Sequence, residues 1–548
     1  MTRAGAGSAV LTAASLLWLG QAALLADAVG RIASGEGAAA VLPHAAGVLV
    51  LGMIRASCDH AGARLVFQAA RAEVNRLRET VVRSLAARSP LDKDRPASGL
   101  AASALAEQAE AILPYLTRFL PARQRCVLVP PAILACVFPL SWLAGLLLLL
   151  AAPLIPIFMA LIGWRAKAAS EAQLAELGGM NAFLLDRLRG LATIRALGAV
   201  DITATRLRAD ADSLRERTMK VLRIAFLSSA VLELFAALGV AMIAVYVGFH
   251  LLGQIGFGTW SGRLSLAEGL FILLLAPAFF EPLRDLSAAW HDRAAGKAAL
   301  DGLEALSRQG LPLPGAEAAM PSAGIPRPKA SGLHIQALTF AHTGQDRPVF
   351  QDFSLDIAAG EHVAIMAPSG GGKSTLLSLI AGLALPQRGR ILIDGLELTG
   401  VSAATLRQRM AWIGQDPHIF AGSLSRNVTL GRAAPTDTVP AALDFAKLSE
   451  VAARLGPAPV GEKGLGLSGG EALRLALARI ALLPDAGLIL ADEPTAHLDG
   501  ETARDIADGL IALASGRTLI LATHDPVLAA RMGRVVRLDD LRLMEAAE

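Results

Sequence analysis

Long apolar runs occupy the first half of the chain and stop near residue 280. A helix needs about 20 mostly apolar residues to cross a bilayer, and six stretches qualify. They are residues 8–29, 38–54, 126–140, 142–164, 224–252 and 264–280. The third stretch is short and is broken by Pro130 and Pro131, so its limits are the least defined. The pattern predicts an α-helical domain with six transmembrane spans in residues 1–308.

The first apolar stretch has a second interpretation. Arg3 precedes it, and Ala26-Asp27-Ala28 resembles the small-residue cleavage site of a signal peptide. Cleavage would leave five spans and would place the C-terminal half on the opposite side of the membrane. We therefore favour a resident helix.

Positive charge is unevenly distributed among the loops. Six arginines lie between residues 55 and 83, and eleven Lys or Arg residues lie between residues 165 and 223. The other connections carry few, so both basic loops and both termini are expected in the cytoplasm. Apolar residues recur at helical spacing in 66–85 and 170–197. These helices should continue into the cytoplasm and turn back, near Pro90, Asp92 and Pro96 and in 190–199, at segments that touch a cytoplasmic domain.

Composition agrees with a membrane protein that carries a soluble domain. Hydrophobic residues make up 53% of the chain and charged residues 18%. The net charge of +3 is too small for the concentrated basic face that binds nucleic acid, so no nucleic-acid partner is expected. The three cysteines form neither a disulfide framework nor a metal-ligand spacing. A proline-rich linker covers 309–331, and alternating strand and helix patterns in 332–548 predict an α/β domain.

A phosphate-binding loop is the clearest chemical feature of that domain. A short apolar strand at 363–366 leads into a helix through Ala367, Pro368, Ser369, Gly370, Gly371, Gly372, Lys373, Ser374 and Thr375. Glycines let backbone N–H groups surround phosphate oxygens, and the helix N-terminus adds its dipole. The Lys373 ammonium reaches the outer phosphates, and the Ser374 hydroxyl binds Mg²⁺. ATP and Mg²⁺ are the expected ligands.

Two further motifs complete a nucleotide site. Asp492 and Glu493 follow an apolar strand at 488–491, where an aspartate holds Mg²⁺ and the glutamate polarises the attacking water. Between the two motifs, Ser468, Gly469 and Gly470 open a helix and offer backbone donors to an anion.

This series of motifs resembles the ABC ATPases, whose signature motif is matched by 467–471. In that family the signature completes the ATP site of a partner subunit, so the resemblance implies a dimer. It also implies that Gln415 binds Mg²⁺ and senses the γ-phosphate, that His524 contacts the γ-phosphate, and that His342 stacks on adenine. Three residues depart from the family pattern: His342 replaces an aromatic residue, Ala367 replaces the first glycine, and Glu471 replaces a glutamine.

The apolar half is similar to the transmembrane domain of ABC exporters. Residues 17–22 in the first span and 273–286 at the sixth are similar to the CydD half of CydDC-type exporters. That resemblance implies a heterodimer with a CydC-like half in the bacterial inner membrane, surrounded by membrane lipid. It implies export of cysteine or glutathione in support of cytochrome bd and c-type cytochrome assembly. Haem cargo, a homodimeric lipid or drug exporter, and a mainly regulatory ATP-binding half remain alternatives.

Overall fold

The chain folds into two compact units. The computed structural model describes residues 2–96, 98–153, 190–260, 262–308, 310–316, 329–342, 344–345, 347–435, 437–456, 458–461 and 466–538, with a few positions between 157 and 188. The first unit, here called the helical unit, comprises Met1–Val81 and Ser98–Leu306. The second, here called the α/β unit, comprises Val82–Ala97 and Ser307–Glu548.

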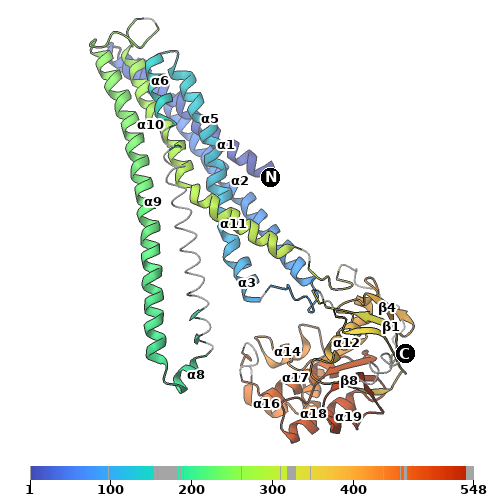
Figure 1. The fold of residues 1–548 in the computed structure, drawn as a ribbon. Coiled ribbons are helices and arrows are strands. Elements are labelled where there is room, and N and C mark those ends of the chain that lie inside the picture. Colours follow the sequence, from blue (N-terminus) through green and yellow to red (C-terminus); the bar gives the residue numbers. More distant parts are fainter. Residues whose placement is uncertain are drawn as a thin grey trace. The chain divides into compact units, whose positions relative to one another are not determined.

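The described part of the helical unit is built mainly from long helices (Figure 1). Its described elements are α1 (Thr2–Ala33), α2 (Ala38–Ala86), α3 (Ser98–Ala106), the 3₁₀ turn η1 (Gln108–Ala111), α4 (Ile112–Pro114), the π turn η2 (Tyr115–Phe119), α5 (Leu120–Val137), α6 (Trp142–Ala151), α8 (Leu191–Ala196), α9 (Val200–Leu251), α10 (Leu266–Ala288) and α11 (Trp290–Ser307).

Five helices in the described part of the chain are long and apolar enough to span a membrane. They overlap the first, second, third, fifth and sixth predicted stretches. Of the fourth, the structure describes the helix α6 and little beyond residue 153; the predicted cytoplasmic helix at 170–197 also lies mostly outside the described residues. The predicted break at Pro130 and Pro131 is wrong, because α5 continues through both prolines. Neighbouring groups can satisfy the backbone that proline frees in such a helix.

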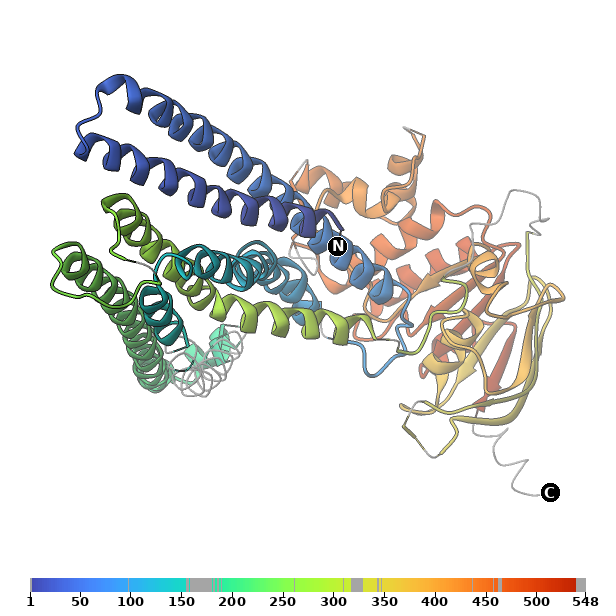
Figure 2. The same ribbon diagram turned by 90° about the horizontal axis from the view of Figure 1, so that it is seen from above.

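Close helix packing builds the core of the helical unit. Residues of α1, α5, α6, α9 and α10 form one hydrophobic cluster, to which α1 contributes the fully buried Ala22. The neighbours α1 and α2 approach closely along small residues (Figure 2). A Cβ on Gly7 would lie 2.8 Å from Cγ2 of Val66, and one on Gly62 would lie 2.8 Å from Cγ of Leu11. Glycine at these contacts lets two helix backbones pack side by side.

The α/β unit alternates strands and helices. Its strands are β1 (Leu333–Phe340), β2 (Phe350–Ile357), β3 (His362–Met366), β4 (Arg388–Ile393), β5 (Leu396–Glu397), β6 (Met410–Ile413), β7 (Leu488–Asp492), β8 (Thr518–Thr523) and β9 (Arg534–Arg537). Its helices are α12 (Lys373–Ile380), α13 (Ala403–Arg407), α14 (Leu424–Thr429), α15 (Thr438–Phe445), α16 (Ser449–Leu455), α17 (Gly469–Ala481), α18 (Gly500–Leu513) and α19 (Pro526–Ala529).

Two sheets organise these elements. Strands β2-β1-β4-β5 form an antiparallel sheet, and β6-β7-β8-β3-β9 form a parallel one. Every residue of β7 and β8 is buried, as expected for parallel strands covered on both faces. The carboxyl ends of β6, β7, β8 and β3 meet at one edge of the parallel sheet. Ligands bind at such an edge in α/β folds.

The turn that follows α2 belongs to the α/β unit. The Ser89 backbone N–H donates to the Leu311 carbonyl at 2.9 Å, and the Ser89 hydroxyl donates to the Leu383 carbonyl at 2.5 Å. The Asp92 carboxylate accepts from the Leu311 N–H at 3.2 Å. Leu91 packs against the core beneath α12. The predicted turn near Pro90 thus contacts the unit that carries the phosphate loop, as we expected of it.

Candidate nucleotide-binding site

The phosphate loop connects β3 to α12. Gly370 and Gly372 have φ angles of +79° and +95°, a left-handed region that glycine enters at little cost. Gly372 is the N-cap of α12, and no side chain caps that end. Pro368, Ser369 and Gly370 are exposed. The free N-terminal N–H groups of α12 therefore point toward an open loop, which is the arrangement that binds phosphate.

Ala367 and Gly371 are matched in size across the loop. Ala367 is buried at 8% exposure. A Cβ added to Gly371 would lie 2.6 Å from the Ala367 Cβ, closer than side-chain carbons approach in folded proteins. The alanine that departs from the family pattern is therefore accommodated by a glycine four residues later.

Lys373 is held by acceptors of this chain. Its side chain is 5% exposed. The ammonium Nζ lies 2.7 Å from the Ala367 carbonyl and 3.2 Å from Oε1 of Glu493. These contacts place a buried cation between the phosphate loop and the end of β7. A phosphate group entering the loop would meet that cation directly.

Asp492 and Ser374 form a set of oxygen donors beside Lys373. The Ser374 hydroxyl bonds to the Asp492 carboxylate. The Oδ1 atom of Asp492 is buried and has no hydrogen-bond partner among the described residues. Burial raises the pKa of Asp492, the bond from Ser374 opposes that rise, and the charge of Glu493 adds to it. A buried carboxylate oxygen without a partner, next to a hydroxyl, fits the hard oxygen ligands that Mg²⁺ prefers.

Glu493 joins the loop to the end of β8. Its φ of +47° is unusual for a residue with a side chain, and such backbone strain is common at functional sites. The Glu493 N–H donates to the Ala522 carbonyl at 2.9 Å. Its Oε2 lies 3.0 Å from Nδ1 of His524, which is 65% exposed. One carboxylate thus bridges Lys373 and His524.

His342 lies beside the start of α12. Its Nε2 is 3.2 Å from the Thr375 hydroxyl, and its ring packs edge-to-face on Phe340 with 5.3 Å between the centroids. Burial lowers the pKa of His342, and the positive charge of Lys93 lowers it further. The ring is therefore neutral at pH 7 and can present a flat, uncharged face.

The remaining predicted residues are not joined to this cluster by any hydrogen bond or ion pair among the described residues. Gln415 follows β6 at the same sheet edge and is exposed. Ser468 caps α17 in a capping box with Glu471, which also pairs with Arg454 at 2.8 Å. A Cβ added to Gly469 would meet no atom within 4 Å.

Sequence reasoning did not anticipate the role of Thr502. A Cβ on Gly470 would lie 2.6 Å from Cγ2 of Thr502, in the first turn of α18. Gly470 is therefore fixed by packing within this chain as well as by any ligand. No motif marks Thr502, so only the structure reveals the contact.

Comparison with known proteins agrees with this geometry. Residues 6–274 match the family model of the ABC transporter transmembrane region, and residues 350–496 match that of the ABC transporter. The chain is 35% identical over 508 residues to the glutathione/L-cysteine transport system ATP-binding/permease protein CydD of Haemophilus influenzae, covering 91% of this chain and 85% of that one. It is 30% identical over 536 residues to the corresponding CydC protein of Bacillus subtilis, covering 96% and 90%.

A solved structure shares the fold. The chain aligns with a bacterial Atm1-family ABC exporter with ATP bound, at a TM-score of 0.73 and 24% identity, covering 100% of this chain and 96% of that one. The predicted fold class, a helical transmembrane domain of exporter type followed by an α/β P-loop domain, is confirmed.

The chain therefore belongs to the ABC transporters, as a multi-pass membrane protein and an ATPase coupled to transport. It binds ATP through the domain that carries the phosphate loop. Within this family it resembles the CydD half-subunits of glutathione/L-cysteine transport systems.

Proposed function

We propose that this chain is the CydD-like half of a heterodimer that exports cysteine or glutathione across the bacterial inner membrane. The observation that carries the proposal is the 35% identity, over 91% of the chain, to a protein named for glutathione/L-cysteine transport. Similarity to a CydC protein supports a related second half as the partner. Supply of thiol to the periplasm would then serve the assembly of cytochrome bd and c-type cytochromes.

The ATP site supports a hydrolytic half. Lys373 and the N–H groups of the loop would hold the phosphates, and Ser374 with Asp492 would hold Mg²⁺, whose charge would offset that of the phosphates. Glu493 orients the attacking water, while His524 and Gln415 contact the γ-phosphate. Ser468, Gly469 and Gly470 complete the site of the partner subunit. The bridge from Lys373 through Glu493 to His524 argues against a purely regulatory half.

The domain assignment follows the same logic. We propose a transmembrane domain in residues 1–308, a linker in 309–331 and an ATP-binding domain in 332–548. The turn in Val82–Ala97 contacts that last domain. Because the turn follows α2 directly, the ATP-binding domain and both termini lie in the cytoplasm, in agreement with the positive charge of the loops.

Haem is the main competing cargo, and the three histidines near the spans do not favour it. His44 is engaged with Asp27 at 2.8 Å and with the Ala40 carbonyl. His250 is 1% exposed, so its ring has no access to a bulky ligand. His60 is exposed, as is common for a single histidine near a membrane boundary.

Transport into inside-out vesicles tests the proposal. The full-length chain, produced with a CydC-type half, should take up labelled cysteine or glutathione in the presence of Mg²⁺ and ATP. It should take up neither haem nor a fluorescent drug at a comparable rate. Vesicles in which Lys373→Ala removes the phosphate-binding cation serve as the inactive control. Uptake of haem alone, or full activity of the chain without a second half, would contradict the proposal.

A further inference from the structure

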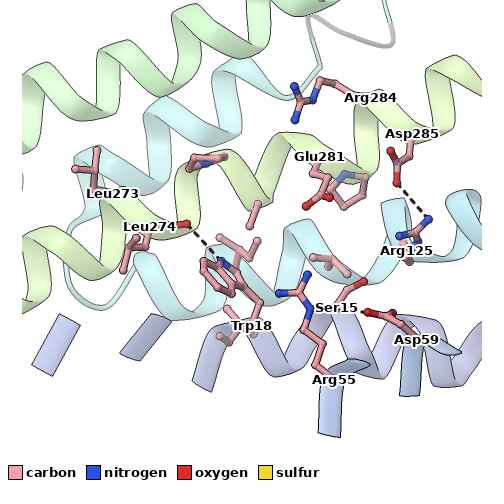
Figure 3. A pocket seen from close by; sticks show the side chains of 16 residues that line it. Ser15, Trp18, Arg55, Asp59, Arg125, Leu273, Leu274, Glu281, Arg284 and Asp285 are labelled. Carbon is pink, nitrogen blue, oxygen red and sulfur yellow. Dashed lines mark hydrogen bonds and ion pairs between the residues drawn. The ribbon is translucent and has the colours of Figure 1, made fainter. Parts of the chain in front are cut away.

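A cavity of about 710 Å³ lies within the helical unit. Its volume falls in the range of small-molecule sites. Trp18 of α1, Arg55 of α2, Arg125 of α5 and Glu281 of α10 all reach it (Figure 3). These helices are among those long and apolar enough to span a membrane. The charged lining residues of the cavity begin where the predicted spans end, at Arg55, Arg125 and Glu281.

The charges around this cavity balance. Its lining includes three basic and three acidic side chains: Arg55, Arg125, Arg284, Asp59, Glu281 and Asp285. A lining of a single sign would select an ion of the opposite sign. A lining with both signs and no net charge is complementary to a ligand that itself carries both charges.

Most of these charges are already paired within the chain. Arg125 lies 3.2 Å from Asp285. Arg284 lies 3.2 Å from Glu233, which is outside the lining. Glu281 makes no hydrogen bond or ion pair with any residue that the structure describes, and it is exposed to the cavity. The acid with the least internal compensation is therefore Glu281.

Arg55 is the least compensated cation. Its Nε lies 4.0 Å from Oδ2 of Asp59, at the outer limit of an ion pair. Its guanidinium packs over the Trp18 ring, 5.5 Å from the centroid, and the Trp18 indole N–H donates to the Leu274 carbonyl at 3.4 Å. The anchored ring orients the flat cation. The remaining N–H groups of Arg55 are then available for a bidentate bond to a carboxylate.

We propose that this cavity binds the amino-acid head group of the exported cargo. Arg55 binds the carboxylate, Glu281 binds the ammonium, and the thiol-bearing remainder lies against apolar lining such as Leu19 and Ile133. This inference rests on the proposed export of cysteine or glutathione and adds the place and the chemistry of recognition. Haem fits poorly: it carries no ammonium group, and none of the sixteen described lining residues is a His, Cys, Met or Tyr that would ligate its iron.

Competition by truncated analogues tests the two assignments separately. Vesicles that contain the full heterodimer are given labelled cysteine or glutathione, with cysteine, cysteamine or 3-mercaptopropionate as competitor. Cysteamine has no carboxylate, and 3-mercaptopropionate has no ammonium. Each should compete at least about tenfold more weakly than cysteine, because each leaves one charge of the site unpaired.

The variants should lose this discrimination in opposite ways. Arg55→Gln should weaken competition by cysteine about tenfold and leave that by cysteamine unchanged. Glu281→Gln should weaken competition by cysteine similarly and leave that by 3-mercaptopropionate unchanged. Arg64→Gln is the matched control, because Arg64 is an exposed residue of the same helix α2 that does not line the cavity. It should keep the selectivity of the wild type.

Thermal shift of the purified heterodimer by cysteine provides a second readout. If both variants transport and discriminate like Arg64→Gln, the cavity assignment is wrong while the proposed function stands. If wild-type protein shows the selective thermal shift but its vesicles take up neither thiol, the proposed export fails and the binding site stands. If it shows neither response, both are overturned.

Discussion

The two units encode their sites in different ways. In the α/β unit the site residues lie in short motifs, the phosphate loop at 367–375 and the acidic pair Asp492-Glu493, and parallel strands bring these motifs to one sheet edge. In the helical unit the cavity residues come from four helices and no short motif unites them. The charges differ as well, because Lys373 is bound by acceptors of its own chain, whereas Arg55 and Glu281 are left largely uncompensated. The nucleotide site is therefore encoded in short sequence motifs, whereas the residues of the proposed cargo site are brought together by the packing of helices.

The largest effect in the α/β unit is expected from Glu493→Gln. The amide can keep contact with Lys373 but cannot polarise water as a carboxylate does. We expect ATP turnover at this site to fall at least about 100-fold while ATP binding persists. Turnover is measured on the heterodimer with the partner's own site disabled, and binding by the ATP-induced thermal shift.

Glu501→Gln is the matched control for that experiment. Glu501 is an exposed acid in the first turn of α18, in the same unit. Its replacement should leave both turnover and binding unchanged. Retained turnover in Glu493→Gln would show that another group activates the water, so the role proposed for Glu493 would be wrong.

A smaller effect is expected from Gly371→Ser. This variant tests whether residues within the phosphate loop itself determine its shape. The added Cβ would lie 2.6 Å from the Ala367 Cβ and 3.0 Å from the Pro368 carbonyl oxygen, so the loop must shift. Overpacking of this kind costs about 1–3 kcal/mol, so we expect ATP affinity to fall about tenfold or more. The measurement is the dissociation constant for ATP.

The rescue variant decides whether Ala367 is the cause. Ala367→Gly alone should bind ATP nearly as the wild type does, and adding it to Gly371→Ser should restore most of the lost affinity. Such a non-additive pair is the sign of direct contact. If the double variant is as weak as Gly371→Ser alone, the size match between the two positions is not what shapes the loop.

Sequence alone predicted most of the α/β site and little of the cavity. Strands β3 and β7 were predicted within one residue, because the apolar runs at 363–366 and 488–491 lead directly into the phosphate loop and the acidic pair. The roles of Lys373, Asp492 and Glu493 followed from two short motifs, and that of His524 from the resemblance to ABC ATPases. The contact of Gly470 with Thr502 required tertiary packing that no local pattern records.

In the helical unit the same approach located spans but not contacts. Arg55 was counted only as one of the six arginines between residues 55 and 83, and Arg284 only as part of the segment 273–286. Asp59, Arg125 and Glu281 gave no separate signal, because their meaning depends on which helices pack together. The continuous helix through Pro130 and Pro131 shows the same limit, since neighbouring helices can override a local preference.

The smallest effects are expected for the unfolding midpoint when an aspartate is replaced by asparagine in each unit. Asp492→Asn removes a buried charge whose Oδ1 has no partner, so the unfolding midpoint without nucleotide should rise by about 2–4 °C although Mg²⁺-ATP binding is lost. Because the folded state raises the pKa of Asp492, ionisation costs stability above that pKa. The gain should therefore be full at neutral pH and shrink as the pH falls toward the ordinary value of 3.8.

Asp285→Asn in the helical unit should do the reverse. It leaves the guanidinium of Arg125, now 3.2 Å from Asp285, without its carboxylate, so the midpoint should fall. Midpoints of the two full-length variants are measured by differential scanning fluorimetry at pH 7.5 and pH 5. A lower midpoint for Asp492→Asn at pH 7.5 would mean that the Asp492 carboxylate stabilises the fold in the absence of a metal ion. If the midpoints of both variants shift in the same direction, the proposed difference is wrong. That difference is between Asp492, whose charge lacks a partner, and Asp285, whose charge is paired within the chain.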